Sequence, residues 1–228
     1  MKKLLLAAAA ALMTVGAYAQ YRPTFIISAG YQGATLKIGD SKDTKIASGA
    51  RVGIDADFSL YDAGYMNISL RPGVHFSMKG SKLESGFKFG DLIDTKSSAT
   101  THLYYIDVPI LANVGFNAGE FGVFVNAGPY LGVGVGSSLT TTSNTKTAVT
   151  DPKTTKDSKS TDLFGDNGAY NRFDWGIQVG GGVEYNRFLV GVGAQFGLQN
   201  INRVKESAGM TLPATKNSAF FVTVGYRF

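Results

Sequence analysis

Hydrophobic and polar residues alternate along most of the chain, most clearly over residues 173–198. Two alternating stretches there, 173–185 and 188–198, are separated by Asn186 and Arg187. A period of two is typical of a β-strand with two unlike faces. If Tyr185 pairs with Phe188 across a two-residue turn, the apolar residues of both stretches share one face. The segment therefore predicts a β-hairpin.

The second face of this hairpin consists mainly of glycine. A soluble β-sandwich would carry Lys, Glu and Thr on a face that meets water. Glycine suits the crowded interior of a narrow closed barrel whose outer face contacts lipid. A similar pattern predicts six further strands, at about residues 24–37, 50–60, 66–78, 104–116, 121–136 and 220–228.

The connections between these eight strands alternate between short and long. Those after the second, fourth and sixth strands have two to four residues, whereas the others are longer or polar. Outer-membrane barrels have short periplasmic turns and longer surface loops, and their strands need about ten residues. The pattern predicts an all-β fold, an eight-stranded antiparallel up-and-down transmembrane barrel, with mobile surface loops at about 79–101, 137–170 and 199–216.

The first nineteen residues have the features of a secretory signal peptide. Lys2 and Lys3 precede an apolar run, and Ala17-Tyr18-Ala19 forms a small-residue cleavage site. The apolar run is too short to span a bilayer as an anchor. We expect cleavage after Ala19, which leaves a barrel domain at residues 20–228. The absence of cysteine excludes a lipoprotein and a disulfide framework.

Charge gives no indication of a nucleic-acid partner. Without Lys2 and Lys3 the chain has 20 basic and 17 acidic residues, a net charge of +3. Such a mild excess does not predict nucleic-acid binding.

Most charged residues of the predicted strands lie on the inward phase. Pairing the second and third strands across the turn at 62–64 puts Asp55 opposite Arg71 and Arg51 opposite His75. Because eight strands enclose only enough room for side chains, we expect these charges to pair inside the barrel rather than line a pore. The expected lumen network is Arg51, Asp55, Asp57, Arg71, His75, Asp107, Asp174, Glu184 and Arg227.

The apolar phase should face lipid, with aromatic residues near the ends of the strands. Such residues form girdles at the two membrane interfaces. The expected girdle consists of Tyr104, Phe116, Phe121, Phe173, Trp175, Tyr185, Phe188, Tyr226 and Phe228.

Several segments resemble the PorT-like outer-membrane β-barrel proteins of Bacteroidetes. They are residues 105–111 (YIDVPIL), 128–132 (GPYLG), 173–185 and 224–228 (VGYRF). The resemblance implies an outer-membrane location, an eight-stranded barrel, and insertion by an assembly machinery that reads the C-terminal Phe228. One family member assists a secretion system, but no residue here can be matched to that role.

Catalysis has a weak candidate site. His75 and His102 flank one predicted loop, and Ser77, Ser81 and Asp91 lie nearby in sequence. This is the minimum set for a hydrolase or acyltransferase, but no nucleophile motif surrounds it. We therefore favour a lumen histidine that pairs with Arg51 or a loop group.

Three other patterns could indicate ligands. The glycines at 180–182 and 191–193 resemble nucleotide-binding loops, but no helix follows them. Asp55, Asp57 and Asp107 could form an acid-base or metal cluster, although ion pairing with arginines is the preferred interpretation. Lysines within 137–170 could meet anionic surface sugars, or simply keep that segment solvated.

Three classes of function remain. The first is a non-enzymatic, monomeric outer-membrane barrel without cofactors, which displays loops for envelope integrity, attachment or binding of a surface or periplasmic partner. The second is a small outer-membrane enzyme or secretion accessory factor that acts at the loop rim. A soluble lipocalin-like carrier ranks last, because it would need an apolar lumen.

Overall fold

The computed structural model describes residues 23–39, 45–89, 93–147, 150–160, 163–164, 168–203, 206–207, 210–211 and 213–228. The expected signal peptide and its cleavage site lie outside these residues. Within the described ranges, no helix is long and apolar enough to cross a membrane.

The described chain consists almost entirely of strands. They are β1 (Thr24–Ile38), β2 (Ala47–Asp62), β3 (Met66–Phe89), β4 (Ile93–Ala118), β5 (Phe121–Thr147), β6 (Thr150–Ser160), β7 (Phe173–Tyr185), β8 (Phe188–Gly197), β9 (Glu206–Ser207), β10 (Met210–Thr211) and β11 (Thr215–Arg227).

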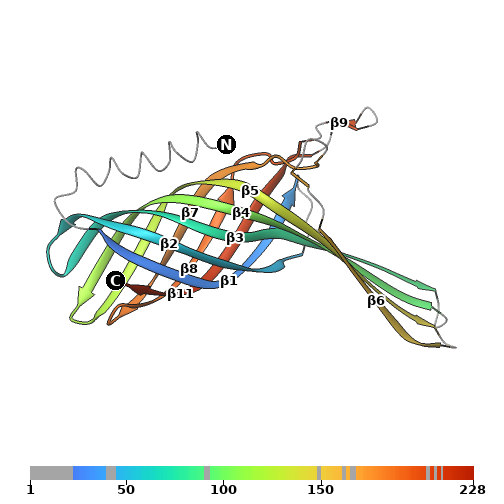
Figure 1. Ribbon diagram of the computed structural model, residues 1–228, viewed down its shortest axis with the longest axis horizontal. Coiled ribbons are helices and arrows are strands. Elements are labelled where there is room, and N and C mark those ends of the chain that lie inside the picture. Colours follow the sequence, from blue (N-terminus) through green and yellow to red (C-terminus); the bar gives the residue numbers. More distant parts are fainter. Residues whose placement is uncertain are drawn as a thin grey trace.

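Eight of these strands close into a ring (Figure 1). The order around it is β1, β2, β3, β4, β5, β7, β8 and β11, and β11 pairs back onto β1. Every pairing is antiparallel. The predicted eight-stranded antiparallel barrel is therefore confirmed. A closed sheet has no free edge within its wall.

The hairpin β7–β8 has the predicted register. Tyr185 pairs with Phe188 and Ile177 with Phe196. The two turn residues, Asn186 and Arg187, have φ of 44° and 72°. Both lie in the left-handed region that a tight two-residue turn of type I′ requires. The length of the turn thus fixes the register of the whole hairpin.

The predicted register of β2 against β3 is wrong by two residues. Asp55 lies opposite Gly73, and Arg51 lies opposite Ser77. Asp62 pairs with Asn67, so the turn is longer than the predicted one at 62–64 and moves the register. A bulge between Ser59 and Tyr61 reverses only one residue of this shift, and period-two alternation alone reveals neither feature. The pairs Asp55–Arg71 and Arg51–His75 consequently do not form.

Two of the three predicted loops are largely strand. The segment 79–101 continues β3 and β4, and 137–170 continues β5 and adds β6. Together they form a four-stranded arm of β3, β4, β5 and β6 that extends beyond one end of the barrel (Figure 1). Residues 137–160 are rich in threonine, which favours strands. Backbone hydrogen bonds between such strands form without a buried core. Within 199–216, β11 already begins at Thr215.

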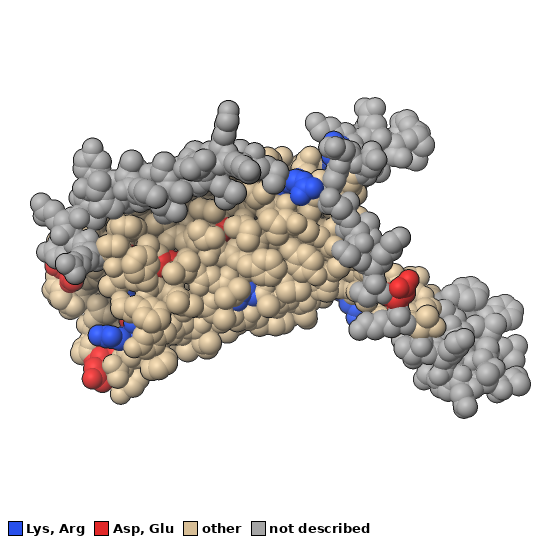
Figure 2. All heavy atoms as spheres, viewed as in Figure 1, with Lys and Arg blue, Asp and Glu red and all other residues tan. Residues whose placement is uncertain are grey.

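The outer wall of the barrel is apolar. Val125, Leu131 and Val224 are exposed by 61–63%, which would be unfavourable in water. Of the outward positions described between the two barrel ends, none carries a charge. Figure 2 shows the visible wall almost free of Lys, Arg, Asp and Glu. This wall matches the lipid-facing band of an outer-membrane barrel.

Candidate functional site

The centre of the lumen is occupied by four charged side chains. Lys79 Nζ lies 3.0 Å from Asp107 Oδ1 and 3.2 Å from Asp174 Oδ2. Arg51 NH1 lies 3.6 Å from Asp107 Oδ2. All four side chains are at most 2% exposed. Two positive and two negative charges balance, as a buried cluster requires.

Neutral groups complete this central network. Gln195 donates to Asp107 Oδ2 at 3.3 Å and to Gln178 Oε1 at 2.9 Å. Tyr130 Oη and Asn217 Nδ2 donate to Asp174 Oδ2 at 3.1 and 2.9 Å. The donors come from β5, β8 and β11, so the network joins distant walls of the barrel. It fills the lumen instead of leaving an open channel.

A second network lies near the end with the tight turns. Arg227 binds Glu184 with two contacts of 2.8 Å, and its NH1 donates to Asp57 Oδ2 at 2.9 Å. Arg71 NH2 lies 2.7 Å from the same Asp57 oxygen. These residues line a polar cavity of about 240 Å³. A bidentate contact between an arginine and a carboxylate is among the stronger ion pairs in proteins.

A third contact joins His75 to Asp55. His75 Nε2 lies 2.9 Å from Asp55 Oδ1. Arg51, the expected histidine partner, instead bonds Ser77 and Gln178. A Cβ at Gly53 would lie 2.2 Å from His75 Nδ1. The glycine-rich inner face therefore makes room for the larger polar side chains.

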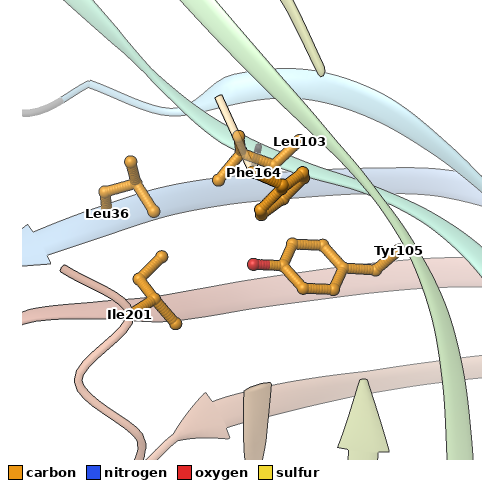
Figure 3. Packing of buried hydrophobic residues seen from close by; sticks show 5 residues of the cluster. All are labelled: Leu36, Leu103, Tyr105, Phe164 and Ile201. Atoms are coloured by element: carbon orange, nitrogen blue, oxygen red, sulfur yellow. The ribbon is translucent and has the colours of Figure 1, made fainter. Parts of the chain in front are cut away.

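The arm end of the lumen is closed by an apolar plug. It consists of Leu36, Leu103, Tyr105, Phe164 and Ile201, all at most 2% exposed (Figure 3). Phe164 and Ile201 belong to the connections between strands and reach inward to meet β1 and β4. A Cβ at Gly134 would lie 2.6 Å from the Phe164 ring, so this glycine provides the space that the ring occupies.

A closed ring of eight strands with an apolar wall and a charged, filled interior is the architecture of a small outer-membrane barrel. Residues 19–203 match the family described as outer membrane protein beta-barrel domain. The chain belongs to this family. It is thus an integral protein of a Gram-negative outer membrane, embedded in the lipid bilayer. No curated protein matches the sequence.

Solved outer-membrane barrels show low sequence identity to this family member. The structure of Ail from Yersinia pestis in complex with the heparin analogue sucrose octasulfate is 14% identical, with a TM-score of 0.36, covering 91% of this chain and 100% of that one. The outer membrane enzyme PagL is 13% identical, with a TM-score of 0.40 and coverages of 88% and 98%. Neisserial surface protein A is 12% identical, with a TM-score of 0.36 and coverages of 90% and 97%.

The expected girdle residues of this barrel lie on its outer face in two groups. Around the tight-turn end, Tyr226 makes edge contacts with Phe188 and Phe228, with ring centroids 5.1 and 5.0 Å apart. Phe116, Phe121 and Tyr185 occupy the same rim, where their strands end. At the arm end, Tyr104, Phe173 and Trp175 face outward.

The nine expected lumen residues all lie on the inner phase, but the sequence interpretation missed Lys79. Lys79 fell in a predicted loop, although the inward alternation of Arg71, His75 and Ser77 continues through it. The expected network also left out the polar residues Tyr105, Tyr130, Gln178, Gln195 and Asn217, which the structure buries in the lumen. Their position on the inward phase could have identified them, because buried charges need hydrogen-bonding partners.

The structure does not assemble the catalytic candidates. His75 pairs with Asp55, whereas His102 Nε2 bonds the backbone oxygen of Ser48. Ser77 Oγ bonds Arg51, and Asp91 lies outside the described residues. The glycines at 180–182, 191 and 193 are within strands. Among the described residues, no group of three His, Cys, Asp or Glu side chains could hold a metal ion.

Proposed function

We propose that this outer-membrane barrel is a non-enzymatic, monomeric scaffold that presents its β arm at the cell surface for attachment or for binding a protein partner. One observation supports this more than any other. The lumen is filled and plugged, whereas β3, β4, β5 and β6 continue as an ordered sheet beyond the barrel. The chain thus builds an extension instead of a channel. Because tight turns are periplasmic in such barrels, the arm lies outside the cell.

The arm offers an unpaired sheet edge. β6 is the last strand in the sheet order, so its outer edge has no neighbour among the described strands. Open edges present backbone donors and acceptors that an extended segment of another protein can pair with. Ser and Thr predominate around this edge, and such a polar edge suits a reversible partner more than a permanent one.

Photo-crosslinking on intact cells tests the partner role. A photoreactive residue at Thr155, on β6, should yield cross-linked partner bands. The same residue at Val224, on the apolar wall, should give only lipid adducts or none. Partner bands of equal strength from both positions, or from neither, would contradict the proposal.

The non-enzymatic character needs a separate test. We expect the variants His75→Ala and His102→Ala to leave outer-membrane lipid composition unchanged, because neither imidazole contacts a serine hydroxyl among the described bonds. Mass spectrometry of extracted lipids gives the readout. A lipid species that disappears in either variant would instead favour an enzyme of the loop rim.

We further infer that the barrel reaches its location as a PorT-like precursor. Residues 1–19 would act as its signal peptide, and the outer-membrane assembly machinery would recognise Phe228. Phe228 is 62% exposed beside Tyr226. N-terminal sequencing of the mature protein should begin at Gln20, and deletion of Phe228 should reduce the heat-modifiable, membrane-inserted fraction. A Phe228 deletion that inserts normally would oppose this assignment.

A further inference from the structure

Lysines of the outward phase gather at the arm end of the barrel. Lys37 on β1 and Lys216 on β11 are exposed and directly opposite each other. Lys45 and Lys82 form a second opposed pair at the base of the arm. Lys96 on β4 is also exposed and lines the same groove as Lys45 and Lys82. We call these five residues the basic arc, and Figure 2 shows basic atoms at this end.

The arc continues the lipid-facing side of the wall. Lys216 lies four residues before Phe220 on the outward phase of β11. Lys82 lies four residues beyond Met78, which pairs with Tyr104 of the expected girdle. Four residues of strand span about 13 Å, or about 10 Å along the barrel axis after tilt. The headgroup layer above the hydrocarbon core is about 5–8 Å thick on each side, so flexible lysine side chains attached just above it can reach back into it.

The pairing of like charges is unfavourable for the barrel itself. Lysines directly opposite each other in a sheet repel. Glu84 relieves one pair, because it bonds Lys45 and lies 2.8 Å from Lys82. Within the described residues, no acidic side chain forms an ion pair with Lys37, Lys96 or Lys216. Among the described residues, the five lysines of the arc thus face one glutamate, which leaves an excess of positive charge there.

An external anion is the natural complement of this excess. We propose that the basic arc binds the phosphate groups of lipid headgroups in the outer leaflet, and so holds phosphorylated lipid against the wall below the arm. Lysine is a common phosphate ligand, since its ammonium donates three hydrogen bonds from a flexible stem. The position on the lipid-facing phase favours a headgroup over a dissolved anion.

Lipid retention in nanodiscs tests the proposal. The full mature chain is placed in phosphatidylcholine nanodiscs that contain a small fraction of diphosphorylated lipid A. These discs then exchange lipid with discs that lack lipid A, and we measure how much lipid A each barrel retains. One lysine near an anionic surface contributes about fivefold, so Lys37→Gln, Lys82→Gln and Lys216→Gln together should lower retention roughly a hundredfold. The matched control neutralises Lys153, Lys156 and Lys159 on β6 and should retain lipid A normally.

Thermal unfolding separates lipid binding from a folding defect. In phosphatidylcholine alone, the arc variant should melt close to the wild-type temperature, because removing the Lys37–Lys216 repulsion offsets losing the solvent-screened contact of Lys82 with Glu84. With lipid A, only the wild type and the β6 control should gain stability, and high salt should abolish the gain. Equal retention by the arc variant, an equal loss in the β6 control, or an equal gain with inorganic phosphate would overturn the proposal.

Discussion

Replacing Lys79 with methionine tests how much the central lumen network stabilises the barrel. Methionine keeps most of the length of the side chain and removes its charge. Asp107 would still have Arg51 at 3.6 Å. Asp174 would keep only the neutral donors Tyr130 and Asn217. The substitution therefore leaves one buried carboxylate without a cation.

The size of the effect follows from these contacts. Lys79 makes two charge-assisted hydrogen bonds, at 3.0 and 3.2 Å, each of which contributes about 1.5–3 kcal/mol. Its ammonium also lies 4.8 and 4.5 Å from the ring centroids of Tyr105 and Tyr130. Removing one partner of a buried ion pair typically costs about 3–5 kcal/mol. We expect Lys79→Met to lower the free energy of unfolding by that amount.

A second substitution distinguishes charge imbalance from lost packing. Lys79→Met combined with Asp174→Asn removes one charge of each sign and should recover at least half of the loss, because replacing a whole buried pair is often nearly neutral. Lys82→Met is the control: this half-buried lysine pairs with Glu84 near solvent, so its loss should change stability far less. A Lys79→Met loss below about 1 kcal/mol, or a double variant as unstable as the single one, would refute the reasoning.

Urea titration in phosphatidylcholine vesicles gives the free energies. Trp175 is the only tryptophan of the chain and adjoins Asp174 in sequence, so its fluorescence reports unfolding of the barrel wall. Comparable slopes with urea concentration for all variants would show that the same surface is exposed in each case.

Three further predictions concern other parts of the barrel. Gly134→Ala should lower the free energy of unfolding by about 1–3 kcal/mol and raise ion conductance in planar bilayers, because the new Cβ would displace the Phe164 ring from the plug. The control Gly136→Ala should change neither quantity, because a Cβ there would lie 3.5 Å from its nearest neighbour. Arg187→Gly should raise stability in urea titrations by about 1 kcal/mol, since φ is 72°; destabilisation would contradict this. Hydrogen bonds from Lys45 and Lys82 lower the pKa of Glu84 from 4.5 to about 2. Their contribution to folding stability is therefore complete above pH 4.5 and is lost as the pH falls towards 2. An NMR titration of the Glu84 carboxyl with a midpoint near 4.5 would oppose this.

Local patterns were enough to predict the barrel. The alternation of apolar and glycine-rich positions identified the wall, and the two-residue turn at Asn186 and Arg187 fixed the register of β7 and β8. The alternating lengths of the connections indicated an up-and-down barrel with its tight turns at one end. These features follow from neighbouring residues, because side-chain direction in a strand has a period of two.

The polar segments were harder to interpret from sequence. A Ser- and Thr-rich stretch such as 137–160 has no apolar period, so it resembles a loop even where backbone pairing continues the strands. The same assumption ended β3 too early and removed Lys79 from the expected network. The inward alternation through Ser77 to Ser81 was the signal that would have kept it.

By itself, the sequence determined which residues face lipid and which face inward, since alternation is a property of each strand. Only the tertiary structure decided which inward residues meet. Lys79 and Asp174 are 95 residues apart, and the long turn between Asp62 and Asn67 brings Asp57 to Arg71 and Asp55 to His75. Phe164 and Ile201 close the lumen from connections that have no periodic pattern. Such contacts depend on strand register and ring closure, which no single stretch of sequence encodes.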